Sequence, residues 1–206
     1  MSRFQNKVAV VAGAEHPLGA ALCTRLAGFG ATVVAIGVDD LALRALASRH
    51  PSKIEPLAMH SGWRDILRLL KDAWEEQPVN IYIDVLPLME GTARGQRPDT
   101  FARSTGLTAA LKDGMVAGRT LGVITIPEPK DSKEDSTNRT GYEALLQRFS
   151  TENKPVRMLG VGLPQHNRDW TREQLVSATD TILMLCHPVS RGVKSGMVID
   201  WALELR

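Results

Sequence analysis

The stretch Gly13–Gly19 is the part of the sequence whose residue types and spacing come nearest to a recognisable chemical use. It reads GAEHPLG and directly follows a short β-branched apolar run. Glycines at a strand-to-helix turn let the backbone approach a dinucleotide pyrophosphate, and the helix N-terminus supplies amides and a partial positive charge. Gly13 and Gly19 are the first and last glycines of that pattern, but His16 and Pro17 hold the two common positions of the middle one. The turn therefore favours a dinucleotide-binding type of fold more strongly than it favours a bound dinucleotide.

Glu15 lies inside the same turn. A carboxylate beside a pyrophosphate would repel it, whereas a carboxylate that points outward into solvent would have no such effect. The sequence leaves both interpretations open. The candidate cofactor contacts within the turn are Gly13, His16 and Gly19.

The histidines do not form a second chemical constellation. They are scattered along the chain and lack the spacing of metal ligands, so we expect no metal site; they are His16, His50, His60, His166 and His187. His166 lies in the stretch LPQHNRD, just after a strand-like run, where ligands of α/β proteins often bind. A functional role for His166 competes there with a solvated loop histidine.

The elements that would position these residues alternate between strand and helix. Seven short apolar runs predict strands, at Lys7–Ala12, Thr32–Ile36, Ile54–Met59, Val79–Leu86, Leu121–Ile126, Val156–Val161 and Met197–Asp200. Such alternation implies right-handed βαβ crossovers. The predicted fold is α/β, a Rossmann-like doubly wound parallel sheet of six to seven strands with helices on both faces.

Helix patterns fill the intervals between the predicted strands. They run from Gly19 to Gly28, from Asp39 or Asp40 through Leu43 and Leu46, over Trp63–Trp74, Phe101–Ala117 and Tyr142–Phe149, and from Thr171 to about Cys186. Thr171 with Gln174 makes a capping box for the last of these helices. Gly91–Pro98 and the polar stretch Pro127–Thr140 are predicted to be loops, because neither offers apolar residues to a core.

Composition bounds the class of protein. The chain has 206 residues with 43% hydrophobic and 23% charged residues and a net charge of +2. This is ordinary for a globular protein, and the charge is too small to predict a nucleic-acid or membrane partner. We expect one domain over residues 1–206 and a cytoplasmic chain without signal peptide or membrane span. Cys23 and Cys186 lie in apolar stretches and are expected to be buried and reduced.

Three segments resemble the short-chain dehydrogenase/reductase family. The opening NKVAVVAGAEHPLGAALCTRLAGFGATVVAIG resembles the family's first βαβ unit, VRMLGVGLP its sixth strand, and SGMVID its last strand. The resemblance spans nearly the whole chain. It implies the same doubly wound fold, NAD or NADP as the cofactor if there is one, and assembly into dimers or tetramers through helices and the last strand.

The resemblance also locates the residues that would hold a cofactor. Family members select NAD with an acidic residue at the end of the second strand, or NADP with a nearby arginine; here Gly37 and Val38 stand at those positions and can do neither. Asp39 lies one residue later, where it could reach a ribose or, together with Asp40, cap the next helix. The family's Asn-Asn-Ala-Gly turn after the fourth strand corresponds to Asp84–Pro87, with no match.

The family's catalytic residues find no counterpart here. Members use a tyrosine as proton donor, a lysine four residues later that lowers the phenol pKa, and a serine from the preceding strand. Tyr142 is followed four residues later by Leu146. A register counted back from the sixth strand instead puts Ser132 and Ser136 at the tyrosine and lysine positions, and the serine position falls at Pro127–Glu128. Tyr142 is therefore the one weak catalytic candidate, and the alternative for it is an ordinary half-buried helix residue.

These departures predict a protein that has the family's fold but lacks its catalytic residues. We expect a non-catalytic subunit or scaffold, forming a homo-oligomer or a hetero-oligomer with a related active subunit, with no high-affinity NAD or NADP. Two alternatives remain: an NAD(P)-dependent oxidoreductase acting on a small carbonyl or alcohol with a relocated acid-base group, and a small-molecule sensor using the vestigial pocket.

Overall fold

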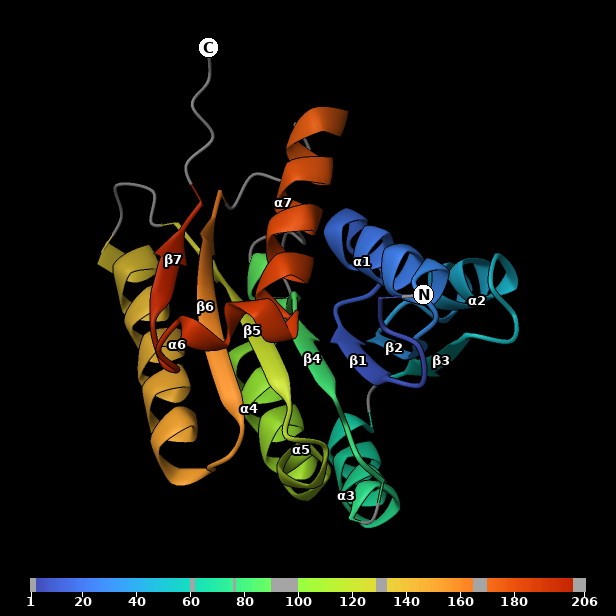
Figure 1. Cartoon of the computed structure of the whole chain (residues 1–206), viewed down its shortest axis with the longest axis horizontal. Coiled ribbons are helices and arrows are strands. Elements are labelled where there is room, and N and C mark those ends of the chain that lie inside the picture. The colour runs from blue at the N-terminus through green and yellow to red at the C-terminus, as the bar shows by residue number, and fades with distance from the viewer. Residues whose placement is uncertain are drawn as a thin grey trace.

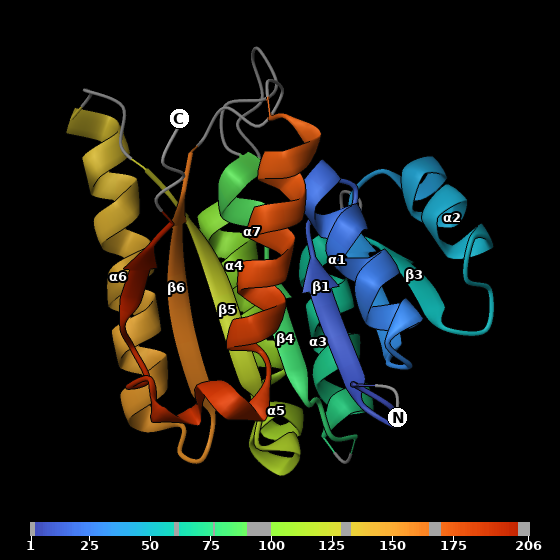
Figure 2. The ribbon, with the colours of Figure 1, turned by 45° about the horizontal axis from the view of Figure 1, so that its top comes forward.

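A computed structural model of the chain describes residues 3–59, 62–75, 77–89, 100–128, 133–164 and 170–201. Seven parallel strands form one sheet in the order β3-β2-β1-β4-β5-β6-β7, with helices covering both faces (Figures 1 and 2). The strands are β1 Val8–Ala12, β2 Thr32–Gly37, β3 Ile54–Ala58, β4 Ile81–Asp84, β5 Leu121–Pro127, β6 Arg157–Leu163 and β7 Val198–Asp200. The predicted doubly wound α/β fold is confirmed.

The strand order reverses beside β1, which pairs with β2 on one side and β4 on the other. Ala12, the last residue of β1, lies opposite Ile36 in β2 and Asp84 in β4. The three strands therefore end at nearly the same level. In open parallel sheets, ligands bind outside the carboxyl ends of the strands at such a reversal point.

The helices divide between the two faces of the sheet. They are α1 Pro17–Gly28, α2 Asp40–Ser48, α3 Trp63–Trp74, α4 Thr100–Ala110, α5 Lys112–Gly118, α6 Lys133–Glu152 and α7 Arg172–Leu185. Helices α1, α2 and α7 cover one face, and α3, α4 and α6 cover the other (Figure 2). Among the described residues, no helix is long and apolar enough to cross a membrane.

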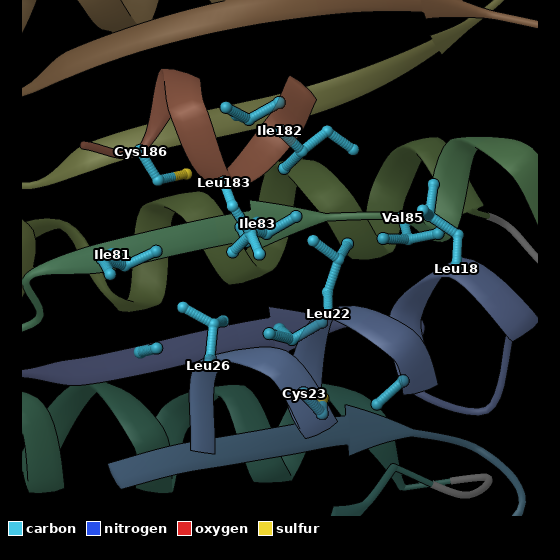
Figure 3. Close-up of a cluster of buried hydrophobic side chains, with 14 of the residues drawn as sticks. Leu18, Leu22, Cys23, Leu26, Ile81, Ile83, Val85, Ile182, Leu183 and Cys186 are labelled. Atoms are coloured by element: carbon cyan, nitrogen blue, oxygen red, sulfur yellow. The ribbon is translucent and has the colours of Figure 1, made fainter. Parts of the chain in front are cut away.

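Each face has its own core. In the first core, under α1 and α7, apolar side chains such as Leu22, Ile83 and Ile182 point toward one another (Figure 3). Cys23 and Cys186 lie in this core as free, buried thiols, as expected. Burial raises the pKa of both thiols to about 12, so they stay protonated and unreactive near neutral pH. The second core, under α3, α4 and α6, also contains polar groups and carries the chemistry described below.

The predicted loop Pro127–Thr140 is wrong over its second half, because α6 already begins at Lys133. Apolar residues farther along the helix, Tyr142 and Leu146, are fully buried and anchor it against the sheet. Helix growth from such an anchor adds one hydrogen bond per residue, and residues 133–140 contain neither proline nor glycine to stop it. The polar composition of this stretch therefore indicated exposure but not the absence of a helix.

Other boundaries shift by a few residues. The predicted helix Phe101–Ala117 is divided at Leu111 into α4 and α5. The predicted strand Val79–Leu86 is shorter, because the 3-10 turn Leu86–Met89 follows β4 almost at once. The capping box of α7 is confirmed, with Thr171 and Gln174 bonded to each other's backbone amides. The predicted loop at Gly91–Pro98 lies outside the described residues.

Candidate functional site

The glycine turn lies at the carboxyl end of β1 and packs closely against its neighbours. Gly13 has a φ of +74°, a conformation that side chains disfavour, and a Cβ there would come 3.0 Å from the Leu86 amide. A Cβ on Gly19 would overlap the Gly13 carbonyl oxygen. Gly19 is therefore required by the close passage of α1 over the end of β1, and Gly13 by its positive φ and by the close approach of the segment that follows β4.

Three backbone amides of this turn, those of Ala14, His16 and Leu18, donate hydrogen bonds within the protein. His16 caps α1, because its Nδ1 accepts a hydrogen bond of 3.1 Å from the Leu18 amide. The His16 amide donates to the Gly13 carbonyl (3.1 Å), the Ala14 amide donates to the Ile36 carbonyl (3.0 Å), and Pro17 has no amide hydrogen. A pyrophosphate at this turn would have to compete for these donors.

His16 is held neutral. Its side chain is buried, and burial lowers its pKa to about 4. The imidazole therefore supplies no positive charge to a phosphate near neutral pH. Its role at this position is that of a helix cap.

Glu15 takes an orientation that neither sequence interpretation described. The carboxylate turns away from solvent toward the end of β2, where Oε1 accepts a hydrogen bond of 2.8 Å from the Val38 amide. It covers Gly37 so closely that a Cβ on Gly37 would overlap Oε2. Oε2 is itself buried and has no hydrogen-bond partner within the described part of the chain. The interpretation of Glu15 as an outward, solvated residue is wrong.

The surroundings of Glu15 have opposing effects on its pKa. Burial is the largest effect and raises the pKa of Glu15, while the hydrogen bond from Val38 lowers it. The charge of Asp39 raises this pKa further, and the charge of Arg103 lowers it. Asp39 itself caps α2 by accepting a 3.0 Å hydrogen bond from the Ala42 amide. Of the two interpretations of Asp39, the helix cap is the contact that the structure contains.

Arg103 is a residue of this site that sequence reasoning missed. It comes from α4 and lies over the ring of Trp63, 5.9 Å from its centroid, and its Nε is buried without a hydrogen-bond partner among the described residues. No motif marks Arg103, and its contact with Trp63 arises because α3 and α4 pack together. Its charge is the one cationic influence recorded on the Glu15 carboxylate.

A second buried carboxylate, Asp84, lies at the end of β4. Its Oδ1 accepts from the Leu86 amide at 3.0 Å, and its Oδ2 accepts from the Tyr82 hydroxyl at 3.2 Å. The Thr125 hydroxyl of β5 donates to the Asp84 carbonyl at 2.9 Å. All of these groups have zero or nearly zero exposure, so Asp84 cannot contact a substrate as the structure stands.

Burial raises the pKa of Asp84 to about 6, despite the hydrogen bonds from the Leu86 amide and the Tyr82 hydroxyl that lower it. Burial also raises the pKa of Tyr82, and the neighbouring Asp84 charge adds to that effect. In the sequence, Asp84 stands out only because it does not match the family's Asn-Asn-Ala-Gly turn after the fourth strand. In the structure it ties β4 to β5 and to the following 3-10 turn.

Tyr142 lies inside the second core. It has no solvent exposure, its hydroxyl lies 3.3 Å from the Thr100 hydroxyl, and its ring meets that of Phe101 edge-on at 5.2 Å. The expectation of a half-buried residue is corrected to a fully buried one, because α4 and α6 close over the ring. Leu146, one turn later, is also fully buried.

The alternative register cannot be compared side chain by side chain. Ser132 lies outside the described residues, and Ser136 lies in α6 but its side chain is not described. At the serine position, Pro127 ends β5 and is buried, while Glu128 continues the pairing with β6 through its amide and the Leu163 carbonyl.

Three of the five histidines, His16, His50 and His187, lie within the described residues. His187 caps the 3-10 turn Pro188–Gly192, His16 caps α1, and His60 and His166 lie outside the described residues. Over the described ranges, no three histidine, cysteine or acidic side chains are grouped as metal ligands.

The strand order, the glycine turn and the helical layers together define the fold of the short-chain dehydrogenases. Solved structures match the chain over almost its whole length. One is described as a short chain dehydrogenase from Escherichia coli CFT073, with a TM-score of 0.75, 18% identity and 97% of each chain covered. Another is a short chain dehydrogenase from Shigella flexneri 2a complexed with NADP, with a TM-score of 0.76, 16% identity and 97% of this chain and 98% of that chain covered. A third is a hydroxysteroid dehydrogenase from Escherichia coli, with a TM-score of 0.75, 15% identity and 96% of each chain covered.

The predicted resemblance is thus confirmed at the level of the fold. No protein-family model matches the sequence, and no curated protein sequence matches it. The dehydrogenase fold is kept although the sequence has diverged far from the solved structures. The residues of the site, rather than this likeness, must therefore carry any argument about activity.

Proposed function

We propose that this chain is a non-catalytic protein of the short-chain dehydrogenase fold that works as a subunit or scaffold. The observation that carries the proposal is the pair Tyr142 and Leu146, both with no solvent exposure. A tyrosine that donates a proton to a substrate must contact it and needs a neighbouring cation to lower its pKa from about 10. Tyr142 instead has its ring against Phe101, with leucine where the resemblance expects lysine.

The proposal includes weak binding of NAD and NADP. The residues present fit a dinucleotide poorly, because the amides of Ala14, His16 and Leu18 are engaged internally and Glu15 covers the end of β2. The Shigella flexneri protein, which shares the fold, is complexed with NADP. Under this proposal, a difference in cofactor binding between the two proteins would come from the side chains of the turn, since the architecture around it is shared.

Association is the second part of the proposal. Apolar side chains are exposed on the elements that the resemblance assigns to subunit contacts: Val176 (45%) and Met184 (49%) on α7, and Met197 (46%) next to β7. Burying such side chains against another subunit is favourable. A homo-oligomer, or a hetero-oligomer with a related active subunit, would bury them.

The experiment that tests the proposal measures turnover and assembly on the same preparation. We expect the purified protein to reduce no ketone and oxidise no alcohol with either nicotinamide cofactor, and to be oligomeric by light scattering at micromolar concentration. Tyr142→Phe is the diagnostic variant, and Tyr82→Phe is its matched control, since each removes one buried hydroxyl.

Two results would contradict the proposal. Turnover by the wild type that is abolished in Tyr142→Phe and retained in Tyr82→Phe would make Tyr142 catalytic and favour the oxidoreductase alternative, which the likeness to dehydrogenases supports. An inactive monomer would remove the support for a scaffold and favour a small-molecule sensor.

A further inference from the structure

The end of β2 is covered by a side chain from another element. In doubly wound folds, the residue at this strand end and the glycine turn together hold the adenosine half of a dinucleotide, and a carboxylate there accepts from the ribose hydroxyls. Here the strand end is Gly37, which has no side chain, and the Glu15 carboxylate reaches across from the turn to the Val38 amide. A carboxylate therefore lies at the ribose position but is bonded to the protein itself.

The fit between Glu15 and Gly37 explains why the carboxylate can lie there. Any residue larger than glycine at position 37 would overlap Oε2. The hold is incomplete, however, because Oε2 is buried and lacks a donor within the described ranges. A buried oxygen without a donor is unfavourable, so the carboxylate, which accepts only from the backbone amides of Val38 and of Glu15 itself among the described residues, should be easy to displace.

We propose that Glu15 is an internal occupant of the ribose position, and that this occupancy, more than the missing middle glycine, keeps the site from binding a dinucleotide. The inference rests on the proposed function, which expects weak cofactor binding.

Four variants of the full chain distinguish an effect of the space that Glu15 occupies from an effect of its charge. Glu15→Ser removes the occupant. Glu15→Gln keeps its length and an oxygen for the Val38 amide but removes the charge. Gly37→Ala leaves Glu15 in the sequence and forces its carboxylate to move, because the new methyl group would overlap Oε2, while the methyl itself is much smaller than the carboxylate. Glu55→Ser, at an exposed position on the edge strand β3, is the matched control.

The measurement is a fluorescence titration of each variant with NADPH and with NADH, after circular dichroism has verified folding. We expect Glu15→Ser and Gly37→Ala to bind at least one of the two about ten-fold more tightly than the wild type. Glu15→Gln and Glu55→Ser should bind as weakly as the wild type. If Glu15→Ser fails to fold, Gly37→Ala gives the answer on its own.

Two results would overturn the inference while leaving the proposed function intact. One is a weakly binding wild type whose affinity is unchanged by both Glu15→Ser and Gly37→Ala. The other is a Glu15→Gln protein that binds as tightly as Glu15→Ser, which would assign the effect to charge rather than occupancy. Tight binding by the wild type would instead contradict the proposed function itself.

Discussion

The two buried carboxylates, Glu15 and Asp84, show how differently one fold can treat the same chemical group. Both lie at the carboxyl ends of neighbouring strands, and burial raises the pKa of both. Asp84 is fully buried and has a backbone and a side-chain donor on its two oxygens. Glu15 is only partly buried, and its Oε2 has no donor within the described residues.

The difference indicates which of the two can move. A carboxylate with both oxygens bonded is part of the packing, and removing it leaves buried donors without acceptors. A carboxylate with one buried oxygen that lacks a donor among the described residues can be displaced at smaller cost. Asp84 therefore stabilises the fold, whereas the position of Glu15 determines whether the ribose position is covered or open.

The largest effect is expected for Asp84→Ala. The change leaves the Leu86 amide and the Tyr82 hydroxyl buried without their acceptor and opens a small cavity, so it should destabilise the protein by about 2–4 kcal/mol. Urea unfolding at about pH 4.5, where Asp84 is protonated in the folded protein and no ionisation cost offsets the loss, measures the effect. A loss below about 1 kcal/mol would contradict the structural role given to Asp84.

Asp84→Asn should have a smaller effect that depends on pH. The pKa of Asp84 is raised from 3.8 to about 6 on folding, so its contribution to stability is present below about pH 4 and is lost as pH rises through 6. Asn is not charged, so the variant should gain up to about 3 kcal/mol relative to the wild type between pH 4 and pH 7.5.

The comparison must be made as a difference between the two proteins. His16, whose pKa is lowered to about 4, acts in the opposite direction, because its contribution is lost as pH falls from 6.5 toward 4. This effect is common to both proteins and cancels in the difference. A difference that stays constant over this pH range would show that Asp84 does not titrate as described.

Asp39→Ala tests the assignment of Asp39 as a helix cap. Loss of the bond to the Ala42 amide should destabilise the protein by about 1 kcal/mol, whereas Asp39→Asn, which can make the same bond, should leave stability nearly unchanged. Thermal unfolding of both variants measures this. Equal losses in the two would indicate that the charge, and not the cap, is what matters at this position.

The smallest effect on stability is expected for Glu15→Ser. The variant loses one hydrogen bond to Val38 but also removes a partly buried charge, so its stability should stay within about 1 kcal/mol of the wild type. Urea unfolding beside Asp84→Ala gives the comparison directly. A loss of stability as large as that of Asp84→Ala would mean that both carboxylates stabilise the fold to a similar extent, and would contradict the difference drawn between them.

The sequence was a good guide to features that local patterns determine. The β-branched runs, the glycines at positions 13 and 19 and the caps at Asp39 and Thr171 each depend on neighbours within a few residues, and the structure has them where they were predicted. The first nine residues of α6, from Lys133 to Gly141, were missed, because the helix is anchored by residues that follow them, such as Tyr142 and Leu146.

The site depended on contacts that no local pattern encodes. Glu15 turns inward because Gly37, more than twenty residues later, leaves room for it. Arg103 contacts Trp63 because α3 and α4 pack together. The bonds around Asp84 likewise join β4 with β5 and with the turn that follows β4. Residue types at the turn could therefore suggest weak cofactor binding, but not the contacts that would cause it.

The most direct test of the whole account is a calorimetric titration of the wild-type protein with NADH and NADPH. The account predicts weak binding or none, because the amides of Ala14, His16 and Leu18 are bonded internally and Glu15 covers the end of β2. A dissociation constant in the low micromolar range for either cofactor would contradict it and return the chain to the class of working dehydrogenases.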